Sequence, residues 1–227
     1  MYELGVVYRN ITRADKAAVE RLSRLGVAAI HEAMGRVGLM KHTMRPAYTG
    51  ARMCGTAITV LLQPGDNWMM HVAAEQIREG DVVVAACTTD SFDGFFGDLL
   101  ATSFQARGAK GLIIDGGVRD VDELQAMGFP VFSRAINAKG TIKATLGSVN
   151  ISVVCSGAQV NPGDVVVADT DGVVVVPAVR AADVADAAEK RESFESEKRA
   201  KFAAGVLGLD MYKMREPLAA AGLKYID

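Results

Sequence analysis

The sequence predicts an α/β fold in which short buried strands alternate with helices. The hexapeptide GDVVVA occurs twice, at 80–85 and 163–168. Each copy joins a turn to a continuous apolar run, which is typical of a strand buried on both faces. Between the two copies, strand-length apolar runs alternate with helical patterns, which favours βαβ units. Half of the 227 residues are hydrophobic and 23 are glycine, enough for one core with many tight turns.

The first half of the chain predicts helices and strands in alternation. Thr12 and Asp15 have the spacing of a capping box, and Gly26 follows as a stop signal. After the turn at 64–67, a further helix precedes the first GDVVVA strand. The expected elements are a helix over 12–25, a helix over 28–34, a strand over 54–62, a helix over 68–77 and a strand over 80–85.

The second half continues the alternation and then becomes helical. The segment DTDG at 169–172 lies between two valine runs and predicts a β-hairpin. The expected elements are helices over 97–107 and 121–127, strands over 112–114, 131–133, 165–168 and 173–176, one long helix over 178–201, and a final helix within 210–227. The sequence has no linker that would separate two domains. We therefore expect one domain, 1–227, with a helical extension from about 178.

The charged half of the long helix, EKRESFESEKRAK at 189–201, has two interpretations. A run of mixed charges usually forms a solvated helix face. Alternatively, this stretch projects onto a neighbouring subunit.

Composition excludes several classes of protein. The net charge is −2 without long runs of one sign, so neither a nucleic-acid footprint nor a polybasic membrane patch is expected. The apolar runs are too short to span a bilayer, and the start MYELGVVYRN lacks the pattern of a signal peptide. Three cysteines without a CxxC motif predict reduced thiols in the cytoplasm rather than a disulfide framework.

Two glycine-rich turns with acidic residues form the candidate site. GDLL at 97–100 opens a predicted helix, and GGVRD at 116–120 follows a predicted strand. In a purely structural interpretation, the negative charge of Asp98 would interact favourably with the dipole of the helix that it opens. Asp120 and Glu123 would then form a capping box. As a site, the free N–H groups of a helix start bind an anion, and Arg119 offers a bidentate fork to a carboxylate. Together the two motifs favour a site for a small carboxylate.

The available ligand types favour a hard cation. His31, His42 and His71 lie in separate segments without metal-ligand spacing, which makes a zinc triad improbable. Carboxylates beside glycine-rich backbone suit Mg²⁺ or Mn²⁺. A Schiff-base lysine is not favoured, because Lys110, Lys139 and Lys143 lie in polar or turn-like surroundings. Neither a phosphate-binding loop nor a GxSxG nucleophile motif is present.

Several longer segments resemble one known family. HEAMGRVGL, LLQPGDNWMMHVAAEQI, GDLLATSFQARGA, KGTIKATLGSVNI, RESFE and GLDMYKMREPL are similar to the family of regulator of ribonuclease E activity A and the bacterial 4-hydroxy-4-methyl-2-oxoglutarate/4-carboxy-4-hydroxy-2-oxoadipate aldolases, and to its aldolase branch in particular. The resemblance implies a swivelling β/β/α fold like that of phosphohistidine domains, with N- and C-terminal helices. It also implies a cytoplasmic homotrimer or homohexamer that acts in aromatic-acid degradation through protocatechuate.

The resemblance implies a class II pyruvate aldolase that needs Mg²⁺ or Mn²⁺ and also decarboxylates oxaloacetate. Arg119 would polarise the pyruvoyl oxygens, Asp120 would hold the metal, and Asp98 would position a water that acts as base. The substrate-binding residues would be Gly97, Asp98, Leu99, Leu100 and Arg119. Glu32 in HEAMGR and Glu195 in RESFE would face the distal carboxylates from the neighbouring subunit. The alternative function, implied by the sister branch, is a non-enzymatic protein-binding regulator of ribonuclease E type.

Overall fold

The computed structural model describes residues 4–227. The chain divides into two compact units, Met1–Ala188 and Glu189–Asp227. The first unit holds all the strands and the hydrophobic core. Within residues 4–227, no helix has both the length and the apolar character needed to cross a bilayer.

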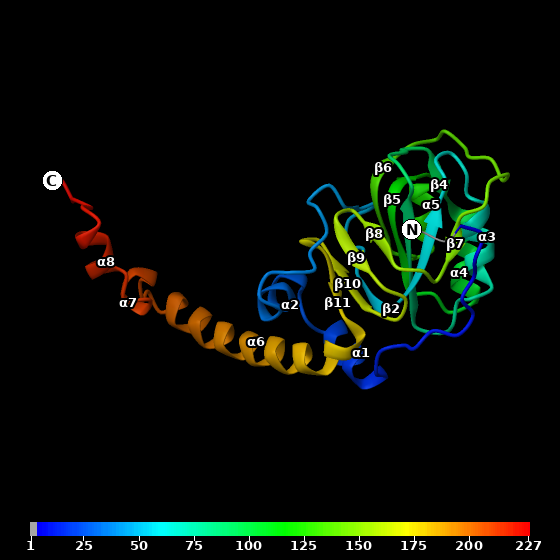
Figure 1. The fold of residues 1–227 in the computed structure, drawn as a ribbon. Helices are drawn as coiled ribbons and strands as arrows, with labels where there is room; N and C mark the ends of the chain where they lie inside the picture. The colour runs from blue at the N-terminus through cyan, green and yellow to red at the C-terminus, as the bar shows by residue number, and fades with distance from the viewer. Residues whose placement is uncertain (1–3) are drawn as a thin grey trace. The chain divides into compact units, whose positions relative to one another are not determined.

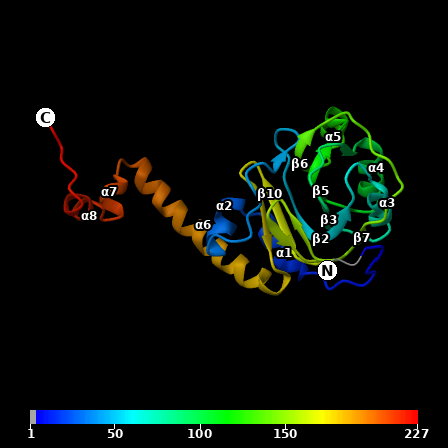
Figure 2. The same cartoon turned by 45° about the horizontal axis from the view of Figure 1, so that its top comes forward.

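Four parallel strands form the centre of the first unit, and they curl strongly (Figures 1 and 2). In spatial order they are β6 (Val131–Ile136), β5 (Gly111–Val118), β3 (Asp81–Cys87) and β2 (Met53–Leu62). The connections run through α3 (Trp68–Ala74), α4 (Asp98–Ala106) and α5 (Val121–Ala126). The sheet therefore contains the predicted βαβ units, because each pair of parallel neighbours is joined through a helix.

Antiparallel strands extend this sheet on both sides. The hairpin of β10 (Val165–Asp169) and β11 (Gly172–Val176) pairs through β10 with β2, and it confirms the predicted turn at Thr170–Asp171. Of the remaining strands, β1 (Arg45–Pro46) beside β6 and β7 (Ser148–Val149) beside β2 are antiparallel, while β4 (Gly94–Phe96) lies parallel to β5. β8 (Val153–Cys155) and β9 (Ala158–Val160) form a separate antiparallel ribbon. The mixed α/β class with a β/β/α arrangement is thus confirmed.

Buried side chains cluster in three groups around the sheet. The first lies between α3, α4 and α5 and one sheet face, and includes Met70, Phe104 and Leu124. The second covers the other face under β8 and β9. The third joins β10 and β11 to α1 (Lys16–Ser23), α2 (Val27–Ala33) and the first turns of α6 (Ala181–Ala203). The strands are buried on both faces, which explains their continuous apolar runs.

The structure corrects several predicted boundaries. The first helix begins at Lys16, because the side chain of Asp15, and not of Thr12, accepts the N–H of Ala18 at 3.0 Å. The strand expected over 112–114 continues to Val118. A 3₁₀ turn over Ala178–Arg180 precedes the long helix. The tail contains two short helices, α7 (Gly208–Met211) and α8 (Arg215–Ala220), where one was expected.

Candidate active site

The two predicted motifs meet where β4 and β5 end. β4 and β5 run parallel, with Phe96 opposite Val118, and the N–H of Arg119 donates to the carbonyl of Phe96 at 2.9 Å. Gly97 to Leu100 therefore begin α4 directly beside Arg119 and Asp120. This position outside the carboxyl ends of parallel strands is where α/β sheets bind ligands.

Asp120 has an unusual backbone conformation that frees its side chain. Its φ and ψ angles of 55° and 44° are left-handed, although the residue is not glycine, and its side chain makes no capping hydrogen bond to α5. The alternative interpretation of Asp120 and Glu123 as a capping box therefore does not hold. Instead, Oδ2 of Asp120 accepts the N–H of Asp98 at 3.3 Å and lies 3.5 Å from Nε of Arg119. Left-handed backbone at non-glycine residues concentrates at functional sites.

Glycine is required at position 97 by the close approach of this carboxylate. A Cβ at Gly97 would lie 1.9 Å from Oδ2 of Asp120, far inside van der Waals contact. The φ of Gly97 is −152°, which any residue adopts. The glycine is therefore explained by the space that Asp120 occupies, and not by backbone freedom.

Replacing Gly97 by alanine is expected to displace the Asp120 carboxylate and to lower activity by about 10²-fold, as is typical of a 1 Å misplacement of a catalytic group. Steady-state kinetics and a thermal melt would measure the effect. Gly26→Ala is the matched control, because a Cβ there meets only Asp169 at 3.9 Å. Unchanged kinetics in Gly97→Ala would show that the position of Asp120 does not matter.

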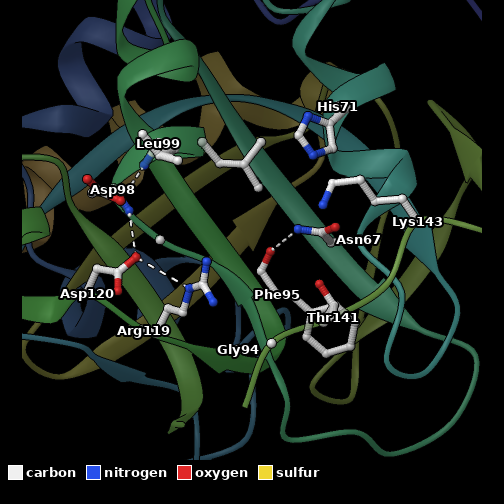
Figure 3. Close-up of a pocket in the computed structure, with 13 residues that line it drawn as sticks. Asn67, His71, Gly94, Phe95, Asp98, Leu99, Arg119, Asp120, Thr141 and Lys143 are labelled. Atoms are coloured by element: carbon white, nitrogen blue, oxygen red, sulfur yellow. Dashed lines mark hydrogen bonds and ion pairs between the residues drawn. The ribbon is translucent and has the colours of Figure 1, made fainter. Parts of the chain in front are cut away.

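A cavity of about 140 Å³ opens in front of these residues. Figure 3 shows Arg119 and Asp120 on one side and Asn67, His71 and Lys143 on the other. The lining residues are Asn67, His71, Gly94, Phe95, Gly97, Asp98, Leu99, Leu100, Arg119, Asp120, Gly140, Thr141 and Lys143. All six residues of the two motifs that we expected in the site line the cavity. The wall formed by α3 and the segment 140–143 was not predicted.

Asn67 is the most informative residue of the unpredicted wall. It is 8% exposed, and its Nδ2 donates to the carbonyl of Phe95 at 2.8 Å. That acceptor fixes the orientation of the amide. The other amide atom, Oδ1, is buried without a hydrogen-bond partner within residues 4–227. Buried acceptors are normally satisfied, so this oxygen calls for a donor from a ligand or a bound water.

His71 lies one helical turn after Asn67 on the same wall. Burial lowers the pKa of His71, and the positive charge of Lys143 lowers it further. The imidazole is therefore neutral at pH 7. Sequence reasoning gave no role to His71, because a single histidine carries no spacing signal.

The two glutamates expected from a neighbouring subunit do not line the cavity of their own chain. Glu32 lies on α2, with Oε1 4.0 Å from Arg36. Glu195 lies on α6, where Nε of Arg191 is 3.0 Å from Oε1 of Glu195. Their proposed role across a subunit boundary stays a prediction.

The carboxylates of the site fit a hard divalent cation. No group of three or more His, Cys, Asp or Glu residues gathers into a metal cluster within residues 4–227. Asp120, which is not used for capping, and its neighbour Asp98 offer carboxylate oxygens at the cavity. Mg²⁺ commonly takes only one or two protein carboxylates and completes its shell with water and substrate. Asp120 is the residue that would hold such an ion.

Curated relatives of this chain carry aldolase names. The chain is 26% identical over 209 residues to a protein of Halalkalibacterium halodurans named "Putative 4-hydroxy-4-methyl-2-oxoglutarate aldolase", covering 91% of this chain and 100% of that protein. A Pseudomonas putida protein of the same name is 34% identical over 113 residues, 50% of this chain and 69% of the relative.

Solved structures show the same fold. The crystal structure of Streptomyces coelicolor RraAS2, titled as an unusual member of the RNase ES inhibitor RraA protein family, has a TM-score of 0.75 at 27% identity and covers 84% of this chain and 99% of its own. An uncharacterized protein from Pseudomonas syringae also gives a TM-score of 0.75 at 27% identity, covering 87% of this chain and 97% of its own. The family model described as RraA-like, Aldolase/RraA, matches residues 27–175, more than half of the sequence, and the chain therefore belongs to the RraA-like family.

Proposed function

We propose that this protein is a class II, divalent-metal-dependent pyruvate aldolase. Its substrates would be 4-hydroxy-4-methyl-2-oxoglutarate, cleaved to two molecules of pyruvate, and 4-carboxy-4-hydroxy-2-oxoadipate, cleaved to pyruvate and oxaloacetate. The observation that carries the proposal is the Asp120 carboxylate. It is held in left-handed backbone, away from helix capping, between the start of α4 and Arg119.

The first turn of α4 suits the carboxylate next to the oxo group. The N–H groups at a helix start lack partners within the helix and attract anions. The N–H of Asp98 already donates to Asp120 at 3.3 Å, and that of Leu99 to the side chain of Asp98 at 2.7 Å. The donors for the substrate would therefore be Leu100, at the cavity wall, and Arg119. The substrate would thus be fixed at its pyruvoyl end beside Arg119.

Cleavage breaks the C3–C4 bond, turns the C4 hydroxyl into a carbonyl and leaves the electron pair as the enolate of pyruvate. Arg119 would stabilise the charge that develops on the 2-oxo oxygen. A Mg²⁺ or Mn²⁺ ion held by Asp120 would supply Lewis-acid stabilisation of the same oxygen. Asp98 would position the water that takes the hydroxyl proton and later protonates the enolate. Loss of CO₂ from oxaloacetate gives the same enolate, so decarboxylation is expected as a side activity.

Activity is expected to depend on a divalent cation. Pyruvate release from 4-hydroxy-4-methyl-2-oxoglutarate and from oxaloacetate should be measured before and after exhaustive chelation, and again after Mg²⁺ or Mn²⁺ is restored. Chelation should abolish turnover and readdition should recover it, because the carboxylates of the site bind cations through oxygen. Turnover that survives chelation would exclude the class II mechanism.

The same assay addresses the alternative function. The match to RraAS2 at 27% identity favours, as second candidate, a non-enzymatic protein-binding regulator. Absence of turnover on every substrate with metal present would support that candidate.

The assembly that we propose is a homotrimer or homohexamer in the cytoplasm. No residue of the second unit, 189–227, is buried. Large apolar side chains there are exposed, among them Phe194, Phe202 and Tyr225. Such a segment lacks a core of its own and gains one by docking on another copy of the chain, where Glu195 would reach the partner's cavity. The three free cysteines suit a reducing compartment.

A further inference from the structure

We propose that Lys143 binds the distal carboxylate of the substrate and thereby selects dicarboxylic over monocarboxylic oxo acids. This inference rests on the proposed function, since it concerns the same cavity. It assigns the distal carboxylate to a cation of this chain, in place of the glutamates of a neighbouring subunit.

The charges of the cavity support this assignment. Two cationic side chains line it, Arg119 on one wall and Lys143 on the opposite wall (Figure 3). Arg119 already lies beside Asp120 at 3.5 Å. Within the described chain, no carboxylate forms an ion pair with Lys143, although the nearby Lys139 lies 3.0 Å from Asp93 and Lys110 lies 2.7 Å from Glu79. Lys143 is therefore available to a ligand anion.

The backbone that carries Lys143 is fixed in place. Asp66, only 2% exposed, accepts the N–H groups of Ala144 and Thr145, each at 2.7 Å. On the other side of Lys143, the carbonyl of Ile142 accepts the N–H of Asn67 at 3.1 Å. Burial alone would raise the pKa of Asp66, but its hydrogen bonds from backbone N–H groups lower the pKa overall. The carboxylate thus stays ionised and holds this segment against α3.

The neighbours of Lys143 make it the effective cation of its wall. His71 has a lowered pKa and carries no charge at neutral pH. Lys143 is therefore the residue that gives this wall its positive charge. The wall thus presents one cation to the cavity, which matches a ligand that carries a carboxylate.

Charge also argues against carboxylates as the partners of the distal group. Glu32 and Glu195 are anions, and a like charge placed next to a substrate carboxylate is repulsive. A lysine gives the opposite sign and donates hydrogen bonds to the carboxylate oxygens.

The test uses two ligands that differ only in the distal group and are not aldol substrates. We would measure the binding of 2-oxoglutarate and 2-oxopentanoate to the full-length protein in the presence of Mg²⁺ by calorimetry. The wild-type protein should prefer 2-oxoglutarate. Lys143→Met should weaken the binding of 2-oxoglutarate by about 10–100-fold, the range expected for the loss of a hydrogen bond to a charged group. The affinity for 2-oxopentanoate should stay unchanged.

Lys139→Met is the matched control, because Lys139 belongs to the same segment but pairs with Asp93 and does not line the cavity. It should bind both ligands like the wild-type protein, and Lys143→Arg should keep most of the preference. The inference would be overturned if Lys143→Met weakened the binding of both ligands equally, or if the wild-type protein bound 2-oxoglutarate no more tightly than 2-oxopentanoate. Failure of the proposed function would show differently, as missing turnover with the binding preference intact.

Discussion

The exchange of Arg119 for lysine is expected to lower kcat by about 10²–10³-fold, the loss typical when one preorganised donor to a developing oxyanion is removed. Lysine keeps the positive charge but loses the planar fork that contacts two oxygens at once. The guanidinium is 45% exposed and its recorded ion pair is with Asp120, so the fold should be unaffected. Pyruvate release under saturating substrate and a thermal melt would measure the two effects.

The outcome for Arg119→Lys separates two kinds of contribution. Near-normal turnover would show that charge alone is sufficient and that bidentate contact is unimportant. A lower melting temperature together with lost activity would instead assign Arg119 a structural role. Arg45→Lys is a suitable control, since Arg45 contacts the backbone carbonyls of Thr170 and Asp171 and lies outside the cavity.

The second large effect is expected for Asp120→Asn. Asparagine tolerates left-handed backbone almost as well as aspartate, and its amide oxygen can still accept the N–H of Asp98. The negative charge is lost, however, and with it the main attraction for a divalent ion. Because metal stabilisation of the enolate oxygen is worth several kcal/mol, kcat/KM should fall by about 10³-fold.

Metal titration makes this prediction specific. The Mg²⁺ concentration for half-maximal activity should rise strongly in Asp120→Asn, while the melting temperature without metal should stay near the wild-type value. Asp120→Ala is less informative, because alanine is strained at a φ of 55°. An unchanged metal requirement in Asp120→Asn would remove Asp120 as the metal ligand.

The sequence was sufficient to predict one wall of the cavity. In both short motifs, 97–100 and 116–120, a glycine turn precedes a polar residue. The alternation of strands and helices predicted that both motifs lie at the same edge of the sheet. The alternative of an ordinary capping box at Asp120 does not hold, because capping rules are local. The left-handed backbone at Asp120 and the contact of its carboxylate with the start of α4 are tertiary features that no local pattern reveals.

The opposite wall could not be predicted, since it forms only through tertiary contacts. Asn67 precedes α3 as its N-cap residue and His71 lies in α3, while Lys143 lies in a segment without regular structure more than seventy residues later. The two parts are joined by the buried carboxylate of Asp66, whose turn-like PGDN context signals only a helix start. Lys143 was set aside because its sequence surroundings are polar, a feature that excludes a buried lysine but not a lysine at a cavity.

The missed strands have a similar cause. β4 has three residues and β7 has two, too few for an alternating or continuous apolar pattern to stand out. Their place is decided by pairing with β5 and β2. The sequence predicted β2 over 54–62, but of β5 only 112–114, which stops short of Gly117 and Val118 that pair with β4.

The order of strands also sets a constraint on how the protein is made. β2 pairs with β3 on one edge, but its other edge pairs with β10, which leaves the ribosome much later. At synthesis rates of about 5–20 residues per second, the 107 residues from Leu62 to Asp169 take roughly 5–20 s. During this interval most of one edge of a ten-residue apolar strand is unpaired, since only β7, which emerges earlier, pairs there with Val60 and Leu61. An unpaired strand edge is a template for aggregation. Nascent chains of this protein should therefore depend on chaperones until the hairpin of β10 and β11 has emerged.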